Sequence, residues 1–146
     1  MATFSRNVTV NWEGSIMEGK GQVKAGTGAF TLPVSFPRRI GDPEGSTSPE
    51  ELIAAAHAAC FAMALNATVG RKGGQIAKTE VTATVTADKG ESGIKITTSK
   101  LSVVAHGLTG IPKEQFAEVA AAAEKGCPVS NALRGSLTIQ LDAKAV

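Results

Sequence analysis

The amino-acid sequence predicts an α+β domain, and three observations lead to this prediction. Segments in which apolar and polar residues alternate, as they do in strands, fill the first third of the chain. One long apolar segment with a helix start signal follows, and a second set of alternating and helical segments completes the chain. The predicted order is three strands, a helix, two strands, two helices and a last strand, without a repeating strand-helix-strand pattern or a phosphate-binding loop.

Composition limits the size, the location and the partners of the protein. The 146 residues, 42% of them apolar, suit a single domain over residues 1–146. The net charge of +2 comes with no block of like charges, so nucleic acid is not an expected partner. The N-terminus alternates as a strand does and is not a signal peptide, and the apolar stretch 52–65 is too short to cross a membrane. We therefore expect a cytoplasmic protein with no membrane span.

The first third of the chain is predicted to be β-structure. In the first strand apolar residues occupy every second position up to Trp12, and Gly14 ends the run. The three predicted strands are residues 7–12, 19–24 and 30–36. Residues 39–47 carry glycine and proline among charges and are predicted to form a surface loop, a kind of segment that often carries function.

A long helix is predicted from Ser48 to about Val69. Ser48 suits the N-cap, Pro49 suits the first helical position, and Glu51 completes a capping box. The stretch 52–65 is apolar on nearly every side. Such a helix must be buried over most of its surface.

The second half of the chain is predicted to hold a hairpin, two helices and a last strand. These elements are residues 80–87, 94–104, 112–125, 128–133 and 137–141. Gly126 ends the first of the two helices and Pro128 begins the second. Cys127 therefore takes the N-cap position of the second helix.

Two cysteines are too few for a disulfide-rich secreted scaffold, so packing, metal binding and redox chemistry are the possible uses of Cys60 and Cys127. Cys60 lies in the apolar helix, where a buried core cysteine is the common interpretation. The amide N–H groups of the short helix point toward Cys127, which favours a thiolate there, although an ordinary cap residue is an equal interpretation. The residue types alone leave both choices open.

A thiol in apolar surroundings has a raised pKa, so a reactive Cys60 needs a nearby cation. Arg38 and Arg39 are the candidates, and in an extended segment their side chains point to opposite faces, so only one can serve. A two-unit drop from a pKa of about 8.5 raises the thiolate fraction at pH 7 from about 3% to about three quarters. Both arginines are equally well explained as solvated surface charges.

His57 precedes Cys60 by one helical turn and is a candidate base, or a metal ligand together with both cysteines. A polar residue within an apolar helix is more often a hydrogen-bonded core residue. Three ligands without a fourth argue against a structural zinc site, so we expect no metal. His106 has no assigned role.

Two motifs carry a resemblance to a known family. The segment SPEELIAAAHAACFAMAL, residues 48–65, resembles the signature helix of the OsmC/Ohr family of thiol-dependent hydroperoxide reductases. GCPVS, residues 126–130, resembles the second cysteine site of that family, and Trp12-Glu13-Gly14 resembles the branch of osmotically inducible protein C (OsmC). The likeness extends over nearly the whole chain.

The resemblance implies an OsmC-like fold and peroxidase activity without a cofactor. It implies that Cys60 attacks the peroxide and that Cys127 resolves the product as a disulfide. It also implies that Arg39 activates Cys60 and that Glu50 fixes this arginine, although Arg38-Arg39 stands where relatives often have one arginine. The implied reductant is a dithiol, of lipoyl type or a small molecule. The apolar side chains expected around the site are Phe36, Phe61 and Met63. They favour organic hydroperoxides over hydrogen peroxide as substrates.

The spacing of Glu50 and Cys60 predicts a homodimer. Ten residues on one helix correspond to about 15 Å, so these side chains cannot share one arginine within a single copy. If two helices cross antiparallel near Ala55, Glu50 of one copy lies beside Cys60 of the other. We therefore expect an intertwined homodimer with central buried helices. The alternative function is a non-catalytic binding or packing domain in which the cysteines are structural or hold a metal.

Overall fold

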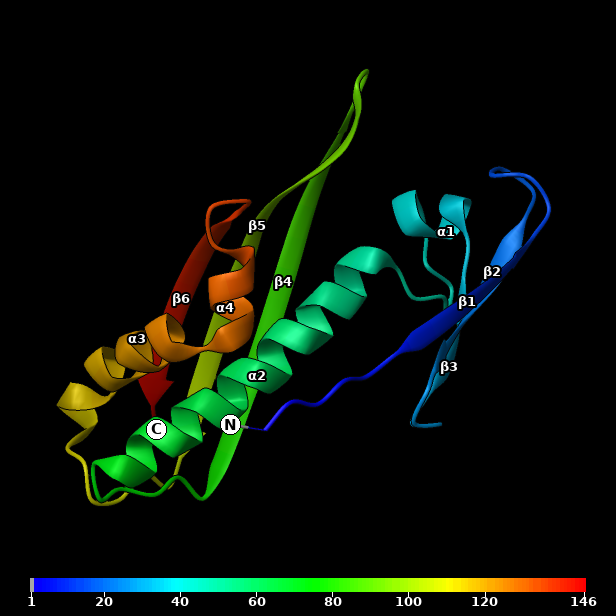
Figure 1. Cartoon of the computed structure of the whole chain (residues 1–146). Helices are drawn as coiled ribbons and strands as arrows, with labels where there is room; N and C mark the ends of the chain where they lie inside the picture. Colours follow the sequence, from blue (N-terminus) through cyan, green and yellow to red (C-terminus); the bar gives the residue numbers. More distant parts are fainter. Residues whose placement is uncertain (1) are drawn as a thin grey trace. The chain divides into compact units, whose positions relative to one another are not determined.

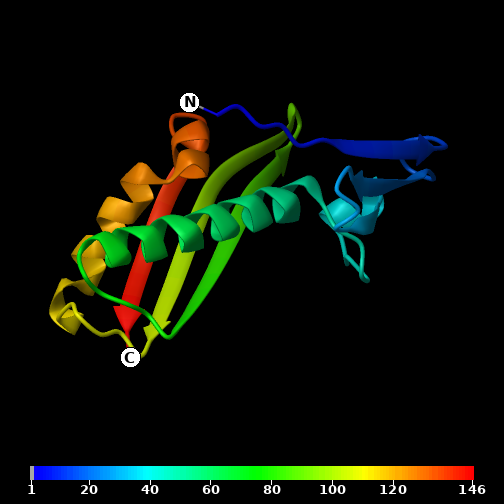
Figure 2. The same cartoon turned by 60° about the horizontal axis from the view of Figure 1, so that its bottom comes forward.

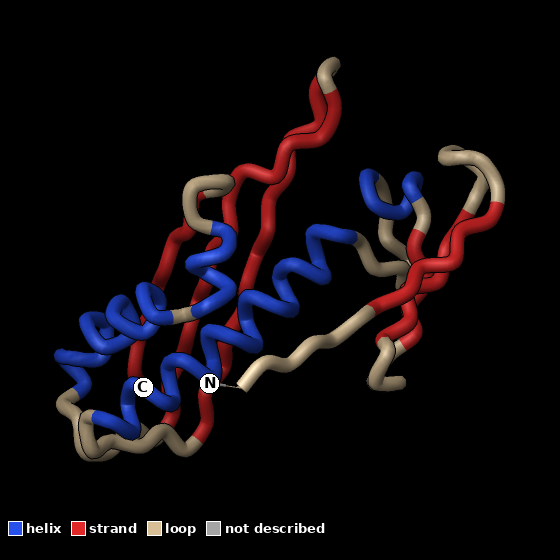
Figure 3. The backbone as a smooth tube through the Cα atoms, viewed as in Figure 1, coloured by secondary structure: helices blue, strands red, loops and turns tan. Residues whose placement is uncertain are grey.

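The elements follow the predicted order with two additions, so the α+β class is confirmed. From the N-terminus they are β1 (Val8–Glu13), β2 (Lys20–Ala25), β3 (Thr31–Val34), α1 (Phe36–Ile40), α2 (Pro49–Arg71), β4 (Lys78–Gly90), β5 (Gly93–His106), η1 (Lys113–Gln115), α3 (Phe116–Gly126), α4 (Pro128–Leu133) and β6 (Thr138–Ala145) (Figures 1 and 3). The structure is a computed structural model, and it describes residues 2–146. The additions are α1 and the single 3-10 turn η1.

The chain divides into two compact units, one that ends at Leu52 and one that comprises Ile53–Val146. The first unit holds the sheet of β1, β2 and β3 together with α1. The second holds the sheet of β4, β5 and β6, the helices α3 and α4, and most of α2. That residues 1–146 form one domain stays a prediction.

The first sheet collects its apolar side chains on one face. Both strand pairs are antiparallel, and the register aligns three apolar rows: Val8 with Ala25; Val10 with Val23 and Leu32; Trp12 with Gly21 and Val34. A Cβ atom at Gly21 would lie 2.9 Å from the Trp12 ring, so only glycine leaves room for this ring. Val10 and Trp12 remain 54% and 39% exposed, so this face of β1 is only partly covered.

Helix α1 corrects the prediction of an extended segment and loop around the two arginines. Ser35 is its N-cap and accepts a hydrogen bond from the backbone N–H of Arg38 at 3.4 Å, and Pro37 lies in the first turn, where a backbone N–H is not needed. Five residues are too few to show a helical apolar period, so the pattern missed this helix. Arg38 and Arg39 therefore lie in one helical turn and not on opposite faces of a strand.

The second sheet combines an antiparallel and a parallel pair. β4 and β5 form a long antiparallel hairpin, whereas β6 runs parallel to β5. Parallel neighbours need a crossover connection, and η1, α3 and α4 supply it. The chain thus contains one strand-helix-strand unit, although its sequence shows no repeating pattern of such units. Helices α2, α3 and α4 lie over one face of this sheet (Figures 1 and 2).

Helix α2 packs on this sheet through one stripe of side chains. Phe61, Leu65 and Val69 recur at every fourth position and are 0 to 1% exposed. They pack in one cluster with buried residues of the strands and of α3: Leu101, Val103, Ala105, Phe116, Val119, Ala120 and Ala123. Cys127 belongs to the same cluster. The core of the second unit therefore surrounds one of the two cysteines.

The opposite face of α2 is exposed in the single chain. The prediction that most of the helix is buried included a second copy of the chain, so it stays a prediction. The exposed apolar side chains are Ala55, Ala56, Ala59, Met63 and Ala67. The sheet can cover only one stripe of a helix, so this face has no partner within the described residues. At 23 residues α2 is also longer than the apolar stretch 52–65, and by length and composition it could cross a membrane. The core helix of a soluble protein passes the same test.

Candidate active site

The predicted site residues form two pairs, one in each unit. Arg39 and Glu50 meet in the first unit, and Cys60 and Cys127 meet in the second. Glu50 and Cys60 both belong to α2, ten residues apart. The first pair is an ion pair, and the second is a pair of thiols.

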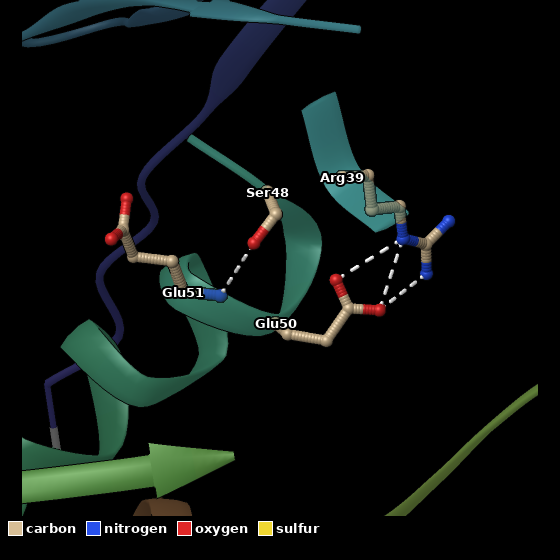
Figure 4. Close-up of polar contacts among 4 residues, drawn as sticks. All are labelled: Arg39, Ser48, Glu50 and Glu51. Atoms are coloured by element: carbon tan, nitrogen blue, oxygen red, sulfur yellow. Dashed lines mark hydrogen bonds and ion pairs between the residues drawn. The ribbon is translucent and has the colours of Figure 1, made fainter. Parts of the chain in front are cut away.

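Arg39 holds Glu50 in a two-pronged ion pair (Figure 4). Arg39 Nε donates to the two carboxylate oxygens at 3.0 and 3.1 Å, and Nη2 donates to Oε1 at 2.7 Å. The side chains are only 25% and 14% exposed. Hydrogen bonding from Arg39 lowers the pKa of Glu50, while burial acts in the opposite direction. The carboxylate therefore keeps its charge and fixes the guanidinium.

The start of α2 leaves Glu50 free for this role. Ser48 Oγ accepts a hydrogen bond from the backbone N–H of Glu51 at 3.1 Å, which is one half of the predicted capping box (Figure 4). The carboxylate of Glu51 does not supply the other half, because it accepts a hydrogen bond from the Thr47 hydroxyl at 2.7 Å. The cap and Glu51 thus order the first turn, and Glu50 points to the arginine.

Arg38 lies in a more exposed environment than Arg39. Its Nη2 atom pairs with Glu44 at 2.6 Å, and its Nη1 atom donates to the backbone carbonyl of Asp42 at 3.2 Å. The Arg38 and Glu44 side chains are 41% and 57% exposed. Arg38 therefore forms an exposed ion pair at the surface of the first unit. Arg39 is the arginine whose carboxylate partner is partly buried.

Cys60 and Cys127 are both free thiols, and Cys127 lies near enough to Cys60 to act on its pKa. Cys127 is fully buried and Cys60 is partly exposed. Burial is the main cause that raises the pKa of Cys60, the Val129 backbone N–H lowers it, and the neighbouring Cys127 raises it again. The Val129 amide at the start of α4 therefore acts on Cys60. The net effect raises the pKa of Cys60 and so favours its protonated form.

A groove of about 410 Å³ opens beside Cys60. It is lined by side chains of α2, α3 and the start of α4: Cys60, Met63, Ala64, Ala67, Thr68, Arg71, Ala122, Ala123, Gly126 and Pro128. Met63 was expected near the site and lines this groove. Phe61 was expected there too, but it faces the core and is 0% exposed. Phe36 begins α1 in the first unit.

His57 is a fully buried, hydrogen-bonded core residue, as the more common interpretation held. Its Nδ1 atom lies 2.7 Å from Ser99 Oγ of β5, and its Nε2 atom lies 2.7 Å from Ser130 Oγ of α4. Within residues 2–146, no three His, Cys, Asp or Glu side chains are grouped so that they could hold a metal ion. Both ring nitrogens are used by hydroxyl groups, so the ring is not directed to a site shared with the cysteines.

Sequence reasoning missed Val129 and Ser130, which follow Cys127 directly in the chain. Val129 contributes a backbone amide, which no side-chain pattern reveals. The sequence spacing could have indicated Ser130. It lies three residues after Cys127, just as His57 lies three residues before Cys60. On two helical segments such spacings place the polar partners one turn away from the thiols.

Burial lowers the pKa of His57 below its ordinary value, so stability should depend on pH. Glu124 acts against this shift and Arg134 acts with it. Because the unfolded chain binds the proton more tightly, the stabilisation is complete above about pH 6.5 and is lost as the pH falls below it. The free energy of unfolding from urea titrations should fall between pH 7 and 5 by at most about 1.4 kcal/mol per pH unit for this one proton.

The variant His57→Gln should remove this part of the pH dependence, whereas His106→Gln should retain it. Glu50 does not interfere, since its lowered pKa affects stability only below about pH 4.5. A pH profile of His57→Gln that matches the profile of the parent chain would contradict the assignment.

Comparisons with known proteins agree over nearly the whole chain. The model of the OsmC-like protein family matches residues 41–142. The chain is 39% identical to peroxiredoxin OsmC of Escherichia coli over 98% of this chain and 99% of that protein. It is 27% identical to organic hydroperoxide resistance protein OhrB of Bacillus subtilis over 99% of this chain and 100% of that protein.

Solved structures show the same fold. The crystal structure of Bacillus subtilis OhrB matches with a TM-score of 0.72 and 29% identity, and covers 94% of this chain and 98% of that one. An organic hydroperoxide resistance protein from Elizabethkingia anophelis matches with a TM-score of 0.76 and 26% identity over the full length of both chains. By its sequence and its fold, the chain belongs to the OsmC-like protein family.

Proposed function

We propose that this protein is a thiol-dependent peroxidase that reduces organic hydroperoxides. The observation that carries the proposal is a pair of neighbouring free thiols, one of which lines an apolar groove. The relatives named peroxiredoxin and organic hydroperoxide resistance protein support the same activity. The alanines and Met63 of the groove suit the organic part of a hydroperoxide better than they suit hydrogen peroxide.

The proposed cycle begins when the thiolate of Cys60 attacks one peroxide oxygen. An S–O bond forms, the O–O bond breaks, and the departing alkoxide takes a proton and leaves as an alcohol. Cys127 then attacks the sulfenic sulfur, so that an S–S bond forms and water leaves. A dithiol reductant, of lipoyl type, restores both thiols by exchange. A disulfide requires Cα atoms about 4.4 to 6.8 Å apart, so the two neighbouring thiols must approach each other in this step.

Intact mass after one equivalent of cumene hydroperoxide tests this cycle. The parent chain should lose two hydrogens. Cys127→Ser should gain one oxygen as a sulfenic acid that a dimedone-type probe captures, because no second thiol can condense with it. Cys60→Ser should show neither change and no peroxide consumption. Peroxide turnover that survives in Cys60→Ser would refute the proposal.

Activation of Cys60 requires a positive charge, because its pKa is raised by burial in the second unit. We propose that Arg39 supplies this charge and that Glu50 holds it in place. The two-pronged ion pair and the low exposure of both side chains support this choice over Arg38, which has an exposed partner. A planar guanidinium can also bind the peroxide oxygen beside the sulfur.

Arg39→Ala and Arg38→Ala form a matched pair for this assignment. At pH 7, Arg39→Ala should slow peroxide attack by about tenfold or more, since a pKa rise of one to three units removes most of the thiolate. The rate should recover as the pH is raised toward the thiol pKa. Arg38→Ala should remain within about twofold of the parent rate. Stopped-flow measurement of peroxide loss against pH gives both numbers, and a larger loss in Arg38→Ala would reverse the assignment.

We further propose an intertwined homodimer in which α2 of one copy crosses α2 of the other, so that Glu50 of one copy lies near Cys60 of the other. Two exposed apolar surfaces support it, one on α2 and one on β1. The α2 surface consists of small alanines beside Met63, and small residues let two helices approach closely. This assembly would combine Arg39, Glu50 and the two thiols in each site of a cytoplasmic protein.

Light scattering with two variants, each of which replaces an alanine by glutamate, tests the dimer. The parent chain should have twice the mass of one chain at micromolar concentration. Ala59→Glu places a charge on the exposed α2 face and should yield monomers, whereas Ala121→Glu on the exposed face of α3 should leave the dimer intact. Both changes are mild for helix propensity, so folding should survive. A monomeric parent chain would overturn the proposal.

A further inference from the structure

A second polar contact runs beside the pair of thiols. His57 lies three residues before Cys60 on α2, and Ser130 lies three residues after Cys127 on α4. Ser130 Oγ is 2.7 Å from His57 Nε2. The His57–Ser130 contact and the neighbouring pair of Cys60 and Cys127 are therefore one helical turn apart and follow opposite directions along the two segments. Together they fix both the position and the rotation of α4 against α2.

We infer that His57 is a positioning residue for disulfide formation, and that its contact with Ser130 holds the start of α4 where Cys127 can reach Cys60. This inference rests on the proposed peroxidase cycle and concerns its second step. His57 touches neither the peroxide nor the reacting sulfur atoms in this role. It acts through Ser130 on the segment that carries Cys127.

The surroundings of His57 make it a rigid spacer between the sheet and α4. Its Nδ1 atom is held by Ser99 of β5 at 2.7 Å, so the ring is fixed from both sides. Ser99, His57 and Ser130 are all 0% exposed, so water does not compete for these contacts. Removal of either serine hydroxyl leaves one ring nitrogen without its partner. Only the Ser130 contact reaches the cysteine segment.

Other charges near His57 lie on α3 and at the end of α4. Glu124 is 8% exposed and pairs with Arg134 at 2.9 Å. Arg134 directly follows α4, so this ion pair ties the far end of the helix to α3. The end of α4 next to Cys127 has the His57 contact as its side-chain tie to α2. Loss of that contact should loosen the cysteine end and leave the far end in place.

Closure of the disulfide is the step that this loosening affects. The two sulfurs must approach to about 2.05 Å with a defined dihedral angle, and small errors in placement cost rate. Attack of Cys60 on the peroxide forms no bond to Cys127. The Val129 amide and Cys127 shift the pKa of Cys60 in opposite directions and lie on the same segment, so their effects on attack offset each other when that segment moves. A positioning role therefore predicts a slow second step with an unchanged first step, which a general loss of stability does not predict.

Ser130→Ala and Ser99→Ala are the matched variants. Each removes one hydroxyl from the same ring, so each should destabilise the fold to a similar extent in urea titration. In single-turnover experiments with cumene hydroperoxide, capture of the sulfenic acid at timed intervals measures attack and closure separately. Attack should proceed within twofold of the parent rate in both variants. Closure should slow at least fivefold in Ser130→Ala and less than twofold in Ser99→Ala.

Substitution of the histidine itself supplies a rescue test. The side-chain amide of His57→Gln can take the place of Nε2 and keep the Ser130 contact, whereas that of His57→Asn can take the place of Nδ1 and keep the Ser99 contact. Closure should be faster in His57→Gln than in His57→Asn. If the serine variants fold poorly, this comparison at equal folded fraction decides the question.

The outcomes separate this inference from the proposed function. Equal closure rates in Ser130→Ala and Ser99→Ala, or faster closure in His57→Asn than in His57→Gln, would overturn the positioning role while the peroxidase cycle stands. Absence of any disulfide in the parent chain after peroxide treatment would overturn the cycle itself, and the positioning role with it.

Discussion

The chemistry of this protein depends on how the first turn of α4 packs against α2. The break at Gly126-Cys127-Pro128 ends one helix and starts another, and this places a buried thiol against the middle of α2. The same turn brings an amide to Cys60 and a hydroxyl to His57. One short element of six residues thus determines the sulfur contact, its electrostatic environment and its register.

The burial that brings the sulfurs together also works against their reactivity. Desolvation raises the pKa of Cys60, and the single amide of Val129 only partly offsets it. In the proposed mechanism the cation is Arg39, which is paired with Glu50 in the first unit. Glu50 and Cys60 are ten residues apart on α2, so the proposed site is completed by a second copy of the chain. Under this proposal, assembly and thiol activation are one requirement.

Sequence periodicity predicted nearly every element, because each strand or long helix buries one regular stripe of residues. It missed α1, whose five residues show no period, although Ser35 and Pro37 are helix start signals. The apolar stretch of α2 predicted a helix that needs partners on most sides, and within the single chain the sheet covers one stripe of it. Tertiary packing determines three further features that no local pattern shows. These are the pairing of β6 with β5, the approach of the Val129 amide to Cys60, and the two serines around His57. The family resemblance of two motifs singled out the cysteines, but only the folded chain brings the Val129 amide to Cys60.

The row of Trp12, Gly21 and Val34 in the first sheet has one more consequence. Trp12 is the only tryptophan and the sequence has no tyrosine, so the intrinsic fluorescence of the protein comes from a single indole ring. This ring lies across Gly21, and its Nε1 atom donates to the Gly14 carbonyl at 3.0 Å. Its emission wavelength therefore reports the local polarity at one apolar surface of β1, and the chain contains a natural optical probe of whatever covers that surface.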